Sequence, residues 1–227
     1  MTGFTPEHVL SWVPAGRLLL VRHARTSANS ARQRMGRRDF DLSDAGRAEA
    51  AALASALATR HVDAVWSSPL RRAFATAKVV AAAHEQRVEV VPDLIEMGFG
   101  VFESPHAHRP KLDVKGAHRR TPLPGGECLQ DVWKRATRVA ARARRQIGSG
   151  QCLVVVGHYR VNQLLVGALS GSTFDDVADD SVHRGANASV YELAFARCGD
   201  AVRLSGSPRL VWSPDSTTES VRLAAPN

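Results

Sequence analysis

Three features are scarce in this sequence of 227 residues, and each scarcity excludes a class of protein. There are only three cysteines, Cys128, Cys152 and Cys198, and their wide spacing fits neither a disulfide framework nor a zinc site. No apolar run reaches about eighteen residues, so we expect no membrane-spanning helix. Residues 1–16 lack the charged and apolar regions of a secretory signal, so we expect a cytoplasmic protein.

Aromatic residues are also few, at 6% of the chain, and no nucleic-acid recognition motif is visible. We therefore expect no nucleic-acid partner, although 30 lysines and arginines against 22 acidic residues give a net charge of +8. The positive charge fits a small anionic partner, or arginines that simply cover a solvated surface. The composition leaves a homo-oligomer open.

Length and a hydrophobic fraction of 44% predict a single domain with a sizeable core over residues 1–227. Residues 1–15 are expected to form an N-terminal arm, and residues 214–227 a C-terminal tail. Residues from about 104 to 126 are rich in proline, glycine, histidine and basic side chains, which predicts a long lid loop.

Strand-like apolar runs alternate with helical segments, a pattern typical of an α/β protein with a mostly parallel sheet. Strands are expected at 17–22, 62–68, 87–94 and 151–158, and helices at 43–60, 69–83, 129–147 and 160–169. Segments 187–195 and 201–206 flank Cys198-Gly199-Asp200 and predict a hairpin at one sheet edge. Three residues are expected to bound helices: Ser43 as an N-cap, Pro69 at a first helical position after a Ser68 cap, and Gly171 at a helix end.

Charged and titratable side chains stand where strands end or helices begin. Arg22 and His23 follow the first strand, His158 ends the last of the four strands, and Arg72 lies in the first turn of a helix. Ligands of an open parallel sheet bind outside the carboxyl ends of its strands. We therefore expect these residues to share one pocket with Glu96.

Two imidazoles, two guanidiniums and one carboxyl group suit the chemistry of phosphoryl transfer. Planar guanidinium groups bind phosphoryl oxygens through two hydrogen bonds, and a neutral imidazole can attack phosphorus and carry the group covalently. The second imidazole and the arginines stabilise negative charge in the transition state. A carboxylic acid can protonate the departing oxygen, and its carboxylate can then activate water. This chemistry requires no metal or other cofactor.

Four motifs carry a family resemblance: "LVRHARTSAN", "SSPLRRAFATA", "LIEMGFGVFES" and "VVVGHYR". In this order and spacing they resemble the histidine phosphatase superfamily, also called phosphoglycerate mutase-like, in its smaller and phosphatase-rich branch. The resemblance runs from about Arg17 to Phe195, with further matches at "DLSDAGRAEA", "PGGE" and "NASV". It implies a three-layer α/β/α sandwich around a mostly parallel sheet.

The resemblance also implies roles for the five residues of the expected pocket. His23 would be the nucleophile that forms a phosphohistidine, and Arg22 and Arg72 would bind the phosphoryl oxygens. His158 would complete this phosphate cradle, and Glu96 occupies the family's proton-donor position.

Further substrate-binding residues are expected at Asn29, Thr26, Arg25 and Tyr159. Asn29 stands three residues after Thr26, where family members place an amide of the phosphate pocket. Arg25 replaces the usual acidic or amide residue, which would make the pocket rim more positive. Tyr159 and Arg160 replace a common Gly-Gly, and they either narrow the pocket and bind a second anionic group or point into neighbouring loops.

Ala24 is a further departure, because the family usually has glycine after the nucleophilic histidine. Its methyl group would strain the turn if the backbone there needs a positive φ.

The sequence favours a hydrolase over the two alternatives, a mutase and a catalytically weak phospholigand-binding homologue. Glu96 and Glu127 are only 31 positions apart, whereas the cofactor-dependent mutases of the family have a much longer segment there. The expected partner is a small phosphate ester, whose identity the sequence does not give. A basic lid suggests an anion larger than one phosphate; its residues are His106, His108, Arg109, Lys111, Lys115, His118, Arg119 and Arg120. His106 and His108 have the spacing of a metal pair but no third ligand, so we expect no metal site.

Overall fold

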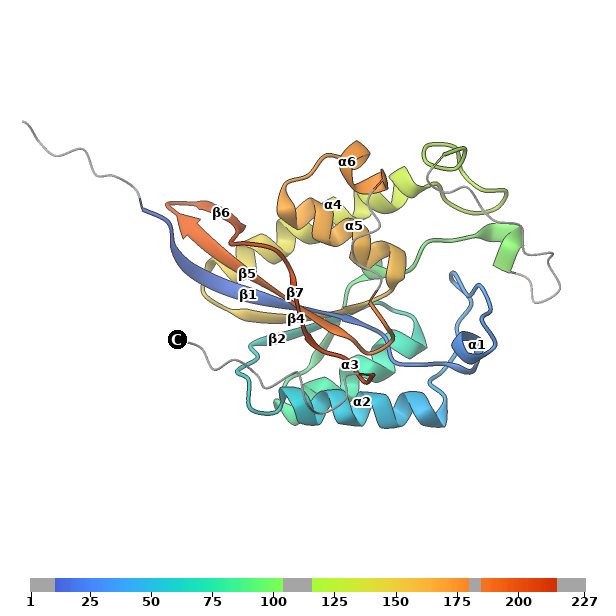
Figure 1. The fold of residues 1–227 in the computed structure, drawn as a ribbon, viewed down its shortest axis with the longest axis horizontal. Helices are drawn as coiled ribbons and strands as arrows, with labels where there is room; N and C mark the ends of the chain where they lie inside the picture. The colour runs from blue at the N-terminus through green and yellow to red at the C-terminus, as the bar shows by residue number, and fades with distance from the viewer. Residues whose placement is uncertain (1–10, 104–115, 180–184, 216–227) are drawn as a thin grey trace, which may run out of the picture.

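A seven-stranded sheet forms the centre of the protein in the computed structural model, which describes residues 11–103, 116–179 and 185–215 (Figure 1). The strand order is β3-β2-β4-β1-β5-β6, and β7 pairs with β5. The strands are β1 (Val13–Arg22), β2 (Ala64–Ser67), β3 (Val88–Val90), β4 (Cys152–Gly157), β5 (Val190–Cys198), β6 (Ala201–Leu204) and β7 (Arg209–Trp212).

The four strands from β3 to β1 are parallel, whereas β5, β6 and β7 run antiparallel to their neighbours. All six residues of β4 are buried, which explains why its sequence CLVVVG lacks the polar alternation of a strand with one exposed face. Helices cover both faces of the sheet (Figure 1). The expected three-layer α/β/α fold with a mostly parallel sheet is therefore confirmed.

Alternation along β1 divides the core between the two faces of the sheet. Leu18 and Leu20 pack in one cluster with residues of α4 (Leu129–Gly148) and α5 (Tyr159–Ser170). Leu19 and Val21 pack in a second cluster with α2 (Asp44–Leu57) and α3 (Arg71–Ala83). A strand that is buried on both faces is apolar at successive positions, because its side chains alternate between the two faces. The run Leu18–Val21 has this character.

Several shorter elements join these layers. They are the one-turn helix α1 (Ser27–Ser30), the helix α6 (Phe174–Asp179) and two 3₁₀ turns at Pro92–Leu94 and Gly100–Glu103. No helix in the described ranges has the length and apolar character required to cross a membrane.

Two of the expected helix boundaries are confirmed, and a third is wrong. The Ser43 side chain caps α2 by accepting a hydrogen bond from the Gly46 N–H, and Gly171 ends α5 in the left-handed conformation with φ 77°. Helix α3, however, begins at Arg71 and not at Pro69. Its first N–H is bound by Asp39 Oδ1 at 2.7 Å, a partner 32 residues away in sequence that no local pattern reveals.

Strand boundaries also differ from expectation. The third strand ends at Val90, and Pro92 opens a 3₁₀ turn instead of continuing the expected strand to residue 94. Strand β1 begins at Val13, within the expected arm, and β7 was not expected. Residues 1–10, 104–115 and 216–227, which include most of the expected arm, lid and tail, lie outside the described residues.

Gly46 lets α2 pack directly on the chain that leaves β1. A Cβ atom placed there would lie 1.8 Å from the carbonyl oxygen of Arg25. The same oxygen accepts a hydrogen bond from the Ser43 N–H at 3.0 Å. This bond holds the start of α2 against the backbone of Arg25.

We therefore expect Gly46→Ala to lower the free energy of unfolding by about 1–3 kcal/mol through overpacking. The higher helix propensity of alanine alone would raise the free energy of unfolding by about 1 kcal/mol. Urea unfolding measures the change, with Ser55→Ala on the exposed face of α2 as the control. A variant as stable as the wild type would contradict the close packing.

Candidate active site

The two histidines of the site follow adjacent parallel strands. Arg22, the last residue of β1, is paired with Gly157, the last residue of β4, and the His23 N–H donates to the Gly157 carbonyl at 3.0 Å. The next residue of each strand is therefore a histidine at the same edge of the sheet. The ring centroids of His23 and His158 are 5.1 Å apart, with the planes inclined at 56°.

The contacts of His23 define its tautomer. Its Nδ1 lies 2.8 Å from the carbonyl oxygen of Ala24, which can only accept, so Nδ1 carries the proton. Nε2 is left with a lone pair. His23 is only 2% exposed, and burial, followed by the charges of Arg72 and Arg22, lowers its pKa well below the usual value. The imidazole is therefore neutral and able to act as a nucleophile.

His158 lies next to His23 and is completely buried. Its Nε2 is 2.7 Å from the Ser68 hydroxyl, which also accepts the Leu70 N–H at 3.3 Å, whereas Nδ1 has no hydrogen-bond partner in the described part of the chain. Burial and then the charge of Arg72 lower the pKa of His158 well below its usual value. Ser68 thus positions the His158 ring through a hydrogen bond, whereas the sequence suggested only a helix cap.

Carbonyl oxygens hold the two arginines of the expected phosphate cradle. The Arg72 guanidinium is 1% exposed and donates to the carbonyls of Arg38 at 2.7 Å and Gly36 at 2.8 Å. Arg22 donates to the Gly185 carbonyl at 2.9 Å. Neither arginine forms an ion pair with another described residue. Burial lowers the pKa of both groups, yet a guanidinium stays protonated in proteins, so the site holds two positive charges without a paired carboxylate.

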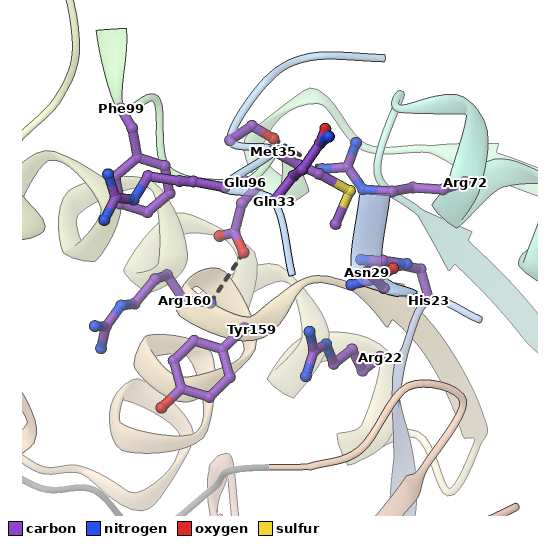
Figure 2. A pocket seen from close by; sticks show the side chains of 12 residues that line it. Arg22, His23, Asn29, Gln33, Met35, Arg72, Glu96, Phe99, Tyr159 and Arg160 are labelled. Carbon is purple, nitrogen blue, oxygen red and sulfur yellow. Dashed lines mark hydrogen bonds between the residues drawn. The ribbon is translucent and has the colours of Figure 1, made fainter. Parts of the chain in front are cut away.

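Glu96 sits at the N-terminus of α5. Its Oε2 accepts the Arg160 N–H at 3.2 Å, and its Oε1 accepts the N–H groups of Val161 at 3.3 Å and Met97 at 2.9 Å. Figure 2 shows this carboxylate between the His23 side of the pocket and the side formed by Tyr159 and Arg160. The end of a helix binds negative charge through its free N–H groups, which fixes the position of the carboxylate.

These groups surround a pocket of about 410 Å³ (Figure 2). Its lining consists of Arg22, His23, Asn29, Gln33, Arg34, Met35, Gly36, Arg72, Glu96, Phe99, Tyr159 and Arg160. The structure thus brings together six of the residues expected from the sequence in the lining, and His158 lies next to His23. Tyr159 and Arg160 face the pocket and do not point into neighbouring loops.

Thr26 supports the pocket from outside. Its side chain caps α1, and both its N–H and its hydroxyl donate to Asn29 Oδ1, at 3.0 and 2.9 Å. The amide group of Asn29 that can serve a ligand is therefore its NH₂. Thr26 itself is fully buried and absent from the lining, and its hydrogen bonds position Asn29.

Arg25 does not make the rim more positive. Its guanidinium forms an ion pair with Glu49 of α2 at 2.8 Å, and its N–H donates to the other oxygen of the same carboxylate at 2.8 Å. Arg25 is also absent from the pocket lining, so the expectation that it binds substrate is not supported. The sequence could not show that a carboxylate 24 residues away neutralises this charge.

The backbone at Ala24 is not strained. Among the described residues with a positive φ, the non-glycine ones are Arg32, Glu85 and Ala188, and Ala24 is not one of them. Its N–H donates to the Thr76 hydroxyl at 3.0 Å, and its methyl group is fully buried. The departure from glycine therefore leaves the turn intact.

The sequence missed the opposite wall of the pocket, which is formed by residues 33–36 and Phe99. Glu103 joins the two parts: its Oε1 accepts the N–H groups of Phe99 at 2.7 Å and Arg37 at 3.1 Å. Gly36 has a φ of 51°, and a Cβ there would meet the Glu103 carboxylate at 2.0 Å. Gly36 and the "VFES" segment were the sequence signals that could have indicated this wall. Their contact, between Gly36 and Glu103, is visible only in the folded structure. No group of three metal-ligating side chains gathers in the described ranges.

Sequence comparison matches residues 18–207 to the family described as histidine phosphatase superfamily (branch 1). A bifunctional protein of Mycobacterium tuberculosis is 38% identical over 160 residues, which cover 66% of this chain and 43% of that protein. Phosphoserine phosphatase 1 of Hydrogenobacter thermophilus is 31% identical over 149 residues, or 63% of this chain and 70% of the relative. The chain thus spans less than half the length of its mycobacterial relative.

The fold is also similar to that of a phosphatase of known structure. The chain superposes on mycobacterial glucosyl-3-phosphoglycerate phosphatase in complex with VO3 with a TM-score of 0.72 and 27% sequence identity. The alignment covers 87% of this chain and 99% of that structure.

The two buried histidines make stability depend on pH. Their folded pKa values lie well below the unfolded value near 6.5, so between these values the unfolded state binds more protons than the folded state. The stability is fully present above about pH 6.5 and is lost as the pH falls toward the folded pKa values. Each histidine contributes a slope of at most about 1.4 kcal/mol per pH unit.

We expect urea unfolding between pH 7.5 and 5 to show this loss in the wild type and flatter profiles in His23→Asn and His158→Asn. Profiles for the variants that run parallel to the wild type would show that these imidazoles already titrate normally in the folded protein.

Proposed function

Because the chain belongs to branch 1 of the histidine phosphatase superfamily, we propose that it is a metal-independent phosphomonoesterase that acts through a phosphohistidine. Its substrate is a small anionic phosphorylated metabolite. The observation that carries this proposal is the buried, neutral His23, whose Nε2 carries a lone pair in a pocket that also contains Arg22 and Arg72. The phosphatases among its relatives support the same reaction class.

The first step transfers the phosphoryl group to His23. The lone pair of Nε2 attacks phosphorus, a P–N bond forms, and the bond between phosphorus and the ester oxygen breaks. Arg22 and Arg72 stabilise the charge on the remaining oxygens, because planar guanidiniums match their geometry. Glu96 in its acid form gives a proton to the leaving oxygen, which departs as an alcohol.

The second step returns the enzyme to its starting state. The Glu96 carboxylate removes a proton from water, whose oxygen attacks phosphorus as the P–N bond breaks. Inorganic phosphate leaves, His23 regains its lone pair, and Glu96 is again protonated. The imidazole of His158 lies 5.1 Å from that of His23, centroid to centroid, and stabilises the negative charge of the transition states.

We expect His23→Ala to abolish release of phosphate from p-nitrophenyl phosphate at mildly acidic pH, because His23 is the one imidazole among the described residues that line the pocket. EDTA is expected to leave the wild-type rate unchanged. Rapid quenching of the wild type with a ³²P-labelled ester is expected to give an acid-labile protein label that His23→Ala lacks.

Full turnover by His23→Ala would overturn the proposal. Phosphate binding without any label would favour a catalytically weak phospholigand-binding homologue, and transfer between phosphoglycerates without phosphate release would favour a mutase.

Two adjacent arginines provide a matched test of the phosphate cradle. Arg72 is buried in the pocket, whereas Arg71 is exposed and forms an ion pair with Asp41 at 3.0 Å. We expect Arg72→Ala to lower kcat/KM for p-nitrophenyl phosphate by about 10²–10³-fold, as for loss of one charged transition-state contact. Arg71→Ala is expected to keep the wild-type rate. Equal losses in both variants would mean that Arg72 acts only through the general charge of the surface.

A further inference from the structure

The pocket has two halves, and the reaction uses only one of them. In Figure 2, His23, Arg22, Asn29 and Arg72 occupy one side, whereas Phe99, Tyr159 and Arg160 lie on the other. Glu96 stands between the two groups. A phosphoryl group on His23 would therefore fill the first half, and the organic part of the ester would extend into the second.

The second half carries its own positive charge. The Arg160 guanidinium lies 5.0 Å from the centroid of the Tyr159 ring, and its Nη1 donates to Gln163 Oε1 at 3.0 Å. No ion pair between described residues involves Arg160. The Arg34 guanidinium lies 5.5 Å from the centroid of the Phe99 ring and also lines the pocket.

Arg160 adds positive charge to the lining beyond what one phosphoryl group requires. Four arginines and one carboxylate, that of Glu96, face the pocket. Arg22 and Arg72 suffice for the oxygens of the transferred group, and the Glu96 oxygens are already held by three backbone N–H groups. The Arg160 guanidinium is supported by the Tyr159 ring, which orients it without neutralising its charge.

We propose that the second half of the pocket binds a second anionic group of the substrate, through Arg160. This inference rests on the proposed phosphatase activity and narrows its substrates to phosphate esters that also carry a carboxylate or a second phosphate. The Tyr159 ring lies 5.7 Å from the Arg22 guanidinium and 5.0 Å from that of Arg160, so it forms the wall that joins the two anion sites.

Paired esters test the proposal directly. Glycerol 3-phosphate and 3-phosphoglycerate differ by one carboxylate, and fructose 6-phosphate and fructose 1,6-bisphosphate differ by one phosphate. We expect the wild type to prefer the more anionic member of at least one pair by about tenfold or more in kcat/KM, the effect of one hydrogen bond to a charged group. The pair that shows the preference identifies the second anion.

Substitution of Arg160 separates this site from the reacting one. Arg160→Gln is expected to reduce the preference about tenfold through a higher KM, and to affect p-nitrophenyl phosphate much less. Arg145→Gln, on the exposed side of α4, removes the same charge and is expected to leave the preference intact.

The outcomes distinguish the two proposals. A wild type that hydrolyses p-nitrophenyl phosphate but treats both members of each pair equally overturns the second anion site and leaves the phosphatase proposal standing. If no ester is hydrolysed, calorimetric titration of His23→Ala with each member of both pairs still tests the site. Tighter binding of the more anionic member of a pair, lost on adding Arg160→Gln, supports it, and equal affinities within both pairs overturn it.

Discussion

The parallel pairing of β1 with β4 is the constraint on which the rest of the site depends. Arg22 and Gly157 are opposite each other at the ends of these strands, so the residues that follow emerge side by side. This register sets the imidazoles of His23 and His158 5.1 Å apart at the carboxyl edge of the sheet. A parallel pair requires a crossover connection, and here that connection supplies Arg72 and Glu96 to the same edge.

The charges around the imidazoles follow from burial. Desolvation and the neighbouring guanidiniums keep both histidines neutral, which preserves the lone pair on His23. The guanidiniums in turn are held by backbone carbonyls, which bind some of their N–H groups without cancelling their charge, while the Nε of each arginine is buried without a partner among the described residues. A phosphoryl group can supply the missing negative charge. The free site is therefore preorganised for an anion, and little reorganisation is required when it binds.

Acidic residues beside the pocket act as structural ties. Glu127 pairs with Arg37 at 2.7 Å and Arg135 at 3.3 Å, and it also accepts the Gly98 N–H at 2.9 Å. Arg135 donates to the carbonyls of Asp93 and Ile95, directly before Glu96. This network fixes the loop that carries Glu96 and ties it to the wall formed by residues 33–36. Glu127 of the "PGGE" motif thus fixes the position of that loop.

Local sequence patterns predicted the parallel strands, the order of the main elements and the residues around His23 that lie together in the pocket. These features depend on neighbours within a few positions, such as the apolar run Leu18–Val21 or the polar residues directly after a buried strand. The caps at Ser43 and Gly171 are equally local. Three features appear only once the chain has folded: Glu49 pairs with Arg25 away from the pocket, Ser68 holds His158, and Phe99 and Arg34 form the far wall. Each of these contacts joins residues at least 24 positions apart, and their partners are chosen by packing, which no local pattern encodes.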